Sequence, residues 1–364
     1  MGSEKNRIIY LDILRIIACI SVVVLHTASM QLWQADIQTN SWIKLIVFDG
    51  VSRFGVPIFV MISGALLLDK KEDTLTVSKS NGLFGEWRQE WVIIRKRIIR
   101  IVVAFIFWSA VYTVYSTVYH HLNIFGICKT FLKGPTHFWF LFMIAALYLI
   151  IPLLRLIANS KYVEYFLILG VIFNFVLPII VWLCGIVDSR IQEIIEYPIN
   201  NMSFSLTKGY AFYFILGHWL KNKEFSRKER SIIYILSAMG FVLVVGGTII
   251  LSRKDGTVNE YFFNNSSIGV GLEALGVFVL IKSLFSRRSF SKRTLSVLKL
   301  LSSSTFGIYL IHVLILHILD YFEINALTVN AVFMVPMTAL ITIALSFGCY
   351  YLISQIPWFN KYII

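Results

Sequence analysis

Long apolar stretches alternate with short polar segments along the whole chain. A helix that crosses a hydrocarbon core of about 30 Å needs about 20 mostly apolar residues. Ten stretches approach or meet this length, at about residues 8–30, 43–68, 98–120, 136–157, 163–187, 206–220, 231–251, 265–285, 301–320 and 328–353. The polar segments between them are too short to hold a soluble domain. The pattern therefore predicts an all-α polytopic membrane helix bundle of about ten transmembrane helices, with residues 1–364 forming a single domain.

The composition supports this reading. Hydrophobic residues make up 57% of the chain and charged residues 15%, against about 45–50% and about 25% in soluble domains. A chain with so few polar residues could not cover the surface of a soluble protein with polar groups. A disordered protein, a secreted disulfide scaffold and a nucleic-acid-binding module are excluded, and we expect the lipid bilayer as partner. The four cysteines lack metal-ligand spacing, so neither a metal nor a disulfide framework is expected.

The net charge of +13 sets the expected orientation. If the N-terminus is cytoplasmic, 24 of the 33 Lys and Arg residues fall in segments on the inner side. An excess of positive charge in inner loops is typical of membrane proteins. The sequence therefore predicts that both termini face the cytoplasm, which requires an even number of spans. It makes no prediction of oligomeric state.

The first span carries the most unusual set of polar residues. Asp12, Arg15, Cys19 and His26 fall within a stripe of about 60° if each residue advances about 100° around a helix. Ionisable residues cost about 2.5–3.5 kcal/mol each at the centre of a membrane helix, so we expect this stripe to face the bundle interior. Asp12 and Arg15 are one turn apart and can pair, whereas His26 lies about 21 Å beyond Asp12. His26 is a candidate general base, although a structural ion pair and a hydrogen-bonded histidine explain the same stripe.

Two further features accompany it. In the second span, Pro57 and the flanking glycines predict a bent helix, either beside a polar cavity or as a packing kink. At the cytoplasmic start of the third span, Arg97 and Arg100 are three residues apart and project from one side. Paired guanidinium groups suit phosphate ligands, and they also serve as anchors that reach lipid headgroups.

The remaining candidates lie in later spans. His137 and Trp139 open the fourth span in a run of aromatic residues that an interface belt would also explain. Glu273 lies in the middle of the eighth span, and we expect this carboxylate to face a cavity. Tyr309 and His312 lie in the ninth. None of these spacings forms a stand-alone catalytic or phosphate-binding motif.

Taken in order, these segments resemble the membrane-bound acyltransferase-3 family. The resemblance covers nearly the whole chain. The stretches that carry it are Asp12-x-x-Arg15 with His26, Arg53-Phe-Gly-Val-Pro57-Ile-Phe with Ile62-Ser63-Gly64, Arg97-x-x-Arg100, His137-Phe-Trp139-Phe-Leu141 with Tyr148 and Pro152, Phe214-x-x-Gly217, and Gly307-Ile-Tyr309-Leu-Ile-His312. Relatives with a C-terminal SGNH hydrolase-like domain differ, and no such domain is expected within these residues.

The resemblance implies transfer of an acetyl group from cytosolic acetyl-CoA to a hydroxyl of an envelope polysaccharide or lipid-linked glycan, in a bacterial inner or cytoplasmic membrane. His26 is then the expected catalytic residue, with Asp12 and Arg15 shaping the inner channel. Arg97 and Arg100 are the expected contacts to the coenzyme's phosphates. The acceptor site is expected to be lined by Ser63, His137, Trp139, Glu273, Tyr309 and His312.

Two other classes of function fit parts of the pattern. A glycan exporter or small-solute transporter would also have about ten spans, a kinked helix and intramembrane charges, but the chain shows no paired inverted halves. A scaffold of an envelope synthesis complex would leave His26 and Arg100 freely replaceable. Binding of acetyl-CoA separates the enzyme from both.

Overall fold

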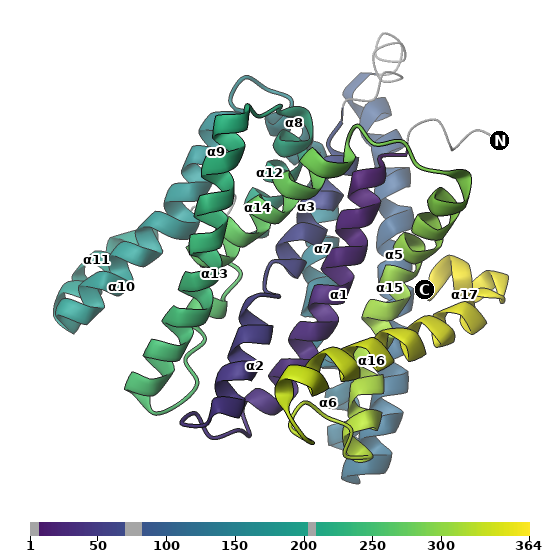
Figure 1. Cartoon of the computed structure of the whole chain (residues 1–364). Coiled ribbons are helices and arrows are strands. Elements are labelled where there is room, and N and C mark those ends of the chain that lie inside the picture. Colours follow the sequence, from purple (N-terminus) through teal and green to yellow (C-terminus); the bar gives the residue numbers. More distant parts are fainter. Residues whose placement is uncertain (1–6, 70–81, 203–208) are drawn as a thin grey trace.

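The computed structural model describes residues 7–69, 82–202 and 209–364, and side chains are described for these except 82–89 and 93. The described residues form helices and no strand. The α-helices are α1 (Ile9–Leu32), α2 (Asn40–Gly50), α3 (Gly55–Leu67), α5 (Gly82–His120), α6 (Ile124–Lys133), α7 (Trp139–Leu149), α8 (Ile151–Ala158), α9 (Val163–Val171), α10 (Leu177–Val187), α11 (Ser189–Asn201), α12 (Tyr210–Asn222), α13 (Arg227–Asp255), α14 (Ile268–Phe285), α15 (Lys292–Tyr321), α16 (Ala331–Ser354) and α17 (Pro357–Tyr362). A 3-10 turn, η1 (Thr136–Phe138), precedes α7, a π-helical turn, η2 (Ile172–Val176), joins α9 to α10, and a second 3-10 turn, η3 (Tyr261–Phe263), precedes α14. The predicted all-α fold is confirmed (Figure 1).

Nine stretches of the described chain are long and apolar enough to cross a membrane, and they make the chain an integral multi-pass membrane protein. They are Ile9–Leu32, Asn40–Leu67, Glu90–His120, Ile124–Leu149, Val163–Val187, Arg227–Asp255, Tyr261–Phe285, Lys292–Tyr321 and Ala331–Ser354. The predicted span 206–220 differs: residues 206–208 lie outside the described residues, and the rest forms α12, which has 13 residues. A 13-residue helix rises about 20 Å, too little to cross alone. The cytoplasmic location of the two termini stays a prediction.

The second span is broken rather than gently bent. Helix α2 ends at Gly50, α3 begins at Gly55, and residues 51–54 form turns between them. Pro57 is the third residue of α3, where a backbone N–H has no partner within the helix in any case. Within the break, Nε of Arg53 lies 2.5 Å from Oδ1 of Asp49 near the end of α2. The predicted bend is therefore confirmed, and its position is set by the glycines and the proline.

Helices α3 and α12 approach until their backbones touch. An ideal Cβ placed on Gly64 would lie 1.7 Å from the carbonyl oxygen of Phe214, and one placed on Gly217 would lie 2.0 Å from that of Met61. Only glycine fits at both positions. The short helix α12 is thus held inside the bundle by α3, and its Phe214 and Gly217 are buried.

Helix α1 lies within the bundle and packs against α2, α3, α14, α15 and α16 (Figure 1). By contrast, α10 and α11 lie at one edge of the molecule, pack against each other and bury no residue. The C-terminal residues return to the core: Ile363 and Ile364 are buried, and Nε1 of Trp108 donates to the carbonyl of Ile363 at 3.2 Å. Arg15 and His26 of α1 face a part of the interior that is also lined by α3, α5, α7 and α15.

Candidate active site

A cavity of about 540 Å³ lies along α1, between α3, α5, α7 and α15. Its volume falls within the range of about 300–1,000 Å³ that is usual for ligand sites. Most of the predicted site residues line it, namely Arg15, His26, Ser63, Arg97, Arg100, His137, Trp139 and Tyr309. Arg15 and His26 are 11 positions apart on α1, which corresponds to about 16 Å along the helix. The cavity therefore runs from a cationic end to an end that contains imidazoles.

The cationic end is formed by α5 and α1. Arg97 and Arg100 both line the cavity, as their spacing predicted. The guanidinium carbon of Arg97 lies 5.8 Å from the ring centre of Tyr148, and Arg97 makes no hydrogen bond or ion pair within the described part of the chain. Arg100 lies 5.2 Å from the ring of Phe306 and donates from Nη2 to the carbonyl oxygen of Ile364. This end can therefore offer guanidinium donors to an anionic ligand.

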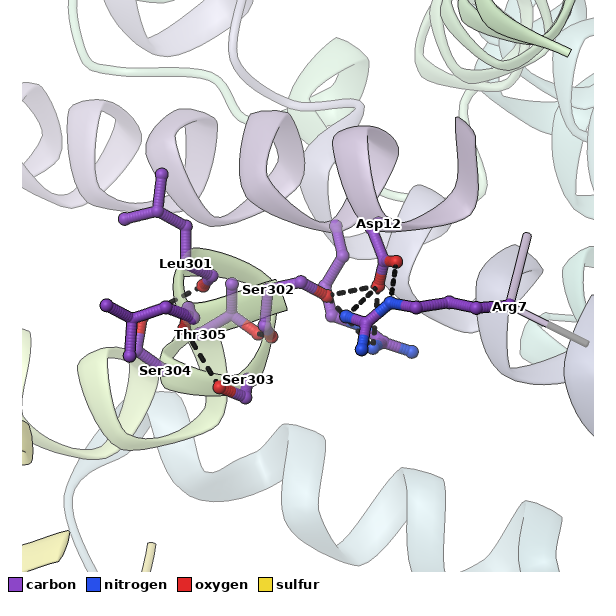
Figure 2. A network of polar contacts seen from close by, with 9 residues as sticks. Arg7, Asp12, Leu301, Ser302, Ser303, Ser304 and Thr305 are labelled. Atoms are coloured by element: carbon purple, nitrogen blue, oxygen red, sulfur yellow. Dashed lines mark hydrogen bonds and ion pairs between the residues drawn. The ribbon is translucent and has the colours of Figure 1, made fainter. Parts of the chain in front are cut away.

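Arg15 is held in place by a polar network around Asp12. Oδ1 of Asp12 accepts hydrogen bonds from Ser302 Oγ at 2.6 Å and from Arg7 Nη2 at 3.0 Å (Figure 2). Nη1 of Arg15 lies 3.9 Å from the same oxygen and donates to Ser302 Oγ at 3.3 Å. The predicted pairing of Asp12 with Arg15 is confirmed. Asp12 itself does not line the cavity, so its carboxylate supports Arg15 rather than contacting a ligand there.

Three histidines from separate elements meet at the far end. The ring centres of His26 on α1 and His312 on α15 are 5.2 Å apart, and His137 in η1 lies 6.0 Å from His26 and 5.2 Å from His312. His137 and His312 are buried, and His26 is half-buried at the cavity wall. The sequence named each histidine, but it held no signal that the three rings would meet.

Hydrogen bonds fix how these rings are presented. Nδ1 of His312 lies 2.7 Å from the carbonyl oxygen of Tyr309 and 3.2 Å from that of Ile308. Because a carbonyl only accepts, the neutral His312 ring carries its proton on Nδ1 and its lone pair on Nε2. Nε2 of His312 and Nε2 of His137 are buried and have no hydrogen-bond partner among the residues described. His312 does not line the cavity, and its ring contacts include those with His26 and His137.

Tyr309 has a supporting place as well. Its hydroxyl donates to the carbonyl oxygen of His137 at 2.6 Å, which ties α15 to the turn that carries His137. Its ring still forms part of the cavity wall, as does Trp139, whose exposed fraction is 39%. Ser63 donates its hydroxyl to the carbonyl of Phe59 at 3.0 Å, one turn earlier on α3.

Glu273 is not where the sequence suggested. It is fully buried on α14 but is not among the residues that line the cavity. Its backbone packs closely against α13 at Gly240, and its charged neighbours are Arg53 and Asp49. The expectation that Glu273 faces the cavity is therefore wrong, because a mid-span position shows that a carboxylate is buried without showing which helices surround it.

No metal site accompanies these groups. Within residues 7–69, 82–202 and 209–364, no group of three or more His, Cys, Asp or Glu side chains is placed to hold a metal ion. The chemistry available at the cavity is that of imidazoles at one end and guanidinium groups at the other.

Comparison with known families identifies the chain as a whole. The family described as "Acyltransferase domain", Acyl_transf_3, matches residues 8–354. No curated protein and no solved structure matches the chain. The match spans nearly every described helix, including those that carry the cavity. The chain therefore belongs to the acyltransferase-3 family of membrane acyltransferases.

Proposed function

We propose that this protein is a membrane O-acyltransferase that moves an acetyl group from cytosolic acetyl-CoA to a hydroxyl of an envelope polysaccharide or lipid-linked glycan. The observation that carries the proposal is the single cavity that joins Arg15, Arg97 and Arg100 to His26. Within one membrane domain, it pairs groups suited to a phosphate-bearing donor with a group suited to proton transfer.

The donor would bind with its phosphates at the cationic end. Guanidinium groups form strong, directional hydrogen bonds with phosphate oxygens, and Arg97 has no competing ion pair in the described chain. The pantetheine arm and its thioester would then extend along the cavity toward the imidazoles. A polar acyl donor needs such a protein-lined channel because lipid offers its amides no partners.

At the imidazole end, neutral His26 would take the proton from the acceptor hydroxyl as the acceptor oxygen attacks the thioester carbonyl carbon. The carbon–sulfur bond then breaks, and the proton on His26 passes to the departing thiolate, so that no net proton is released. A route in which His26 itself carries the acetyl group has the same overall balance.

His312 and His137 would hold His26 ready for this step. Nε2 of His312 offers a lone pair beside His26, with ring centres 5.2 Å apart. If an N–H of His26 donates to this lone pair, the other nitrogen of His26 stays free to act as the base. His312 would then play the part that the buried carboxylate plays in a serine-protease triad. Tyr309 would keep His137 in the same group through its hydrogen bond to the backbone.

The acceptor and the host membrane are proposed on the resemblance to the family alone. The order of motifs resembles that of the O-acetyltransferase of enterobacterial common antigen, but no curated protein matches the chain, so this relationship is not supported and does not help to choose the acceptor. We infer a bacterial inner or cytoplasmic membrane, with the acceptor hydroxyl reached from the side opposite to the coenzyme.

Two measurements test the proposal. His26→Ala should abolish acetylation of envelope glycans, measured by mass spectrometry, at unchanged protein level, whereas His120→Ala, at the exposed end of α5, should leave it intact. Full acetylation by the His26→Ala protein would refute the assignment of His26.

The second measurement concerns the donor. Acetyl-CoA should raise the melting temperature of the purified protein. Arg97→Gln should weaken this binding by about tenfold or more, as expected for loss of a charged hydrogen-bond donor, while Arg95→Gln, on the same helix but outside the cavity, should not. No shift at millimolar acetyl-CoA would favour the transporter.

A further inference from the structure

A second, smaller cavity lies away from the candidate active site, where α12 ends, α13 begins and α14 ends. Its volume is about 220 Å³. Four cationic side chains line it, from Lys223, Arg230, Lys282 and Arg287, and we call it the basic pocket. Glu224 is the single carboxylate in its lining. The wall therefore carries a marked excess of positive charge in a confined space.

Lys282 gives this pocket a fixed charge. Its side chain is only 10% exposed, and Nζ donates to the carbonyl oxygens of Leu220 at 2.9 Å, Lys221 at 2.9 Å and Lys223 at 2.7 Å. All three ammonium protons are thus used to cap the last turn of α12. The nearest carboxylate, Glu224, lies 3.6 Å away with a side chain that is 79% exposed, so solvent weakens this pair.

Two guanidinium groups in the pocket are free to bind. Neither Arg230 nor Arg287 forms a side-chain hydrogen bond or ion pair with any residue whose side chain is described. Lys223 is only loosely paired, with Nζ 3.9 Å from Oε1 of Glu164. The pocket therefore combines donors without partners with a buried positive charge that cannot move away.

The position of the pocket points to the ligand. Helices α13 and α14 belong to membrane-crossing stretches, and the pocket lies at the end where one begins and the other finishes. Phe225 and Val279 are the apolar residues of its lining, and exposed apolar side chains lie close to it in the sequence, such as Ile232 on α13 and Leu284 on α14. A headgroup at this level would meet the cations while its acyl chains followed the apolar helix faces.

We propose that the basic pocket binds a phosphate group, as presented by the headgroup of an anionic phospholipid. Two guanidinium groups and a lysine are the residues that recognise phosphate best. The volume admits a headgroup but is less than half that of the cavity assigned to the acyl donor. The pocket lies where Lys282 ties α14 to the end of α12, so its occupation should stabilise the fold without any acyl transfer.

The test compares two variants of equal charge. Arg230→Gln/Arg287→Gln removes both free donors. The control, Arg227→Gln/Arg288→Gln, removes two cations that do not line the pocket; Arg227 lies three residues before Arg230, and Arg288 follows Arg287 directly. Purified full-length protein in neutral detergent is heated with phosphatidylglycerol, with phosphatidylcholine, or with inorganic phosphate, and bound lipids are counted by native mass spectrometry.

We expect phosphatidylglycerol, and not phosphatidylcholine, to raise the melting temperature of the unmodified protein and of the control variant. The pocket variant should start from a similar melting temperature without lipid and bind phosphatidylglycerol about tenfold more weakly. If inorganic phosphate raises the melting temperature as much as phosphatidylglycerol does, the pocket binds phosphate but its ligand is a soluble molecule rather than a lipid. Equal responses of the two variants, or equal effects of both lipids, would overturn the proposal.

Discussion

Alanine at Gly64 or Gly217 tests the closest helix contact in the fold. A Cβ on Gly64 would lie 1.7 Å from the carbonyl oxygen of Phe214, where ordinary contacts begin at 3.4 Å. Helices α3 and α12 would have to separate by roughly 1.5 Å, and overpacking of this kind costs about 1–3 kcal/mol. Because the obstacle is backbone, which cannot rotate away, we expect a loss near 3 kcal/mol in the free energy of unfolding. The same reasoning applies to Gly217, which faces the carbonyl of Met61.

The chain supplies its own controls for this experiment. Gly246 in the interior of α13 and Gly348 in the interior of α16 have nothing within 4 Å of an added Cβ. Alanine at these positions should stabilise the protein by up to about 1 kcal/mol, since glycine is a poor helix former. Unfolding in mixed micelles by titration with sodium dodecyl sulfate, followed by circular dichroism, measures all four variants. If Gly64→Ala and Gly348→Ala unfold at the same concentration of sodium dodecyl sulfate, the contact between α3 and α12 is not as close as described.

Three further predictions concern polar groups. Tyr309→Phe removes the side-chain donor to the buried carbonyl of His137, which keeps the backbone N–H of Trp139, and should cost about 0.5–1.5 kcal/mol in unfolding free energy, with a loss of acyl transfer larger than the loss of folded protein. Asp12→Asn removes the charge at the centre of the network in Figure 2 and should raise the KM for acetyl-CoA more than it lowers kcat. Outside the spans, hydrogen bonds from the side chain and backbone of Arg190 hold the pKa of Asp188 below its usual range. The ionised Asp188 side chain therefore caps the N-terminus of α11 at neutral pH, and the cap is lost as the pH falls through the lowered pKa of Asp188. Hydrogen exchange of the α11 amides measures this loss.

The sequence predicted what depends on a single helix. Apolar length identified most of the membrane-crossing stretches, because the thickness of a bilayer sets the length of each helix, but it wrongly included the segment that forms the short helix α12. The polar stripe on α1 was likewise correct, since helical geometry alone decides that Arg15 and His26 share a face. The spacing of Arg97 and Arg100 placed both on the cavity for the same reason.

What the sequence could not predict depends on which helices become neighbours. Ser302 holds Asp12 from a position 290 residues away, and nothing in the local pattern marks it as a partner. The meeting of His26, His137 and His312 is of the same kind. Glu273 shows the reverse case, because burial was correctly expected while the surrounding helices were not.

The motifs that point to the family combine two physical roles. Gly64 lets α3 touch α12, and the residue before it, Ser63, lines the cavity. Gly307 on α15 lies where a Cβ would come within 2.5 Å of the Tyr350 ring, and both Tyr350 and Tyr309 form part of the cavity wall. The glycines therefore determine how closely the helices approach each other, and this approach determines where the neighbouring polar side chains lie. It follows that a glycine variant can abolish activity without touching the chemistry, so loss of activity identifies a catalytic residue only where the free energy of unfolding is unchanged.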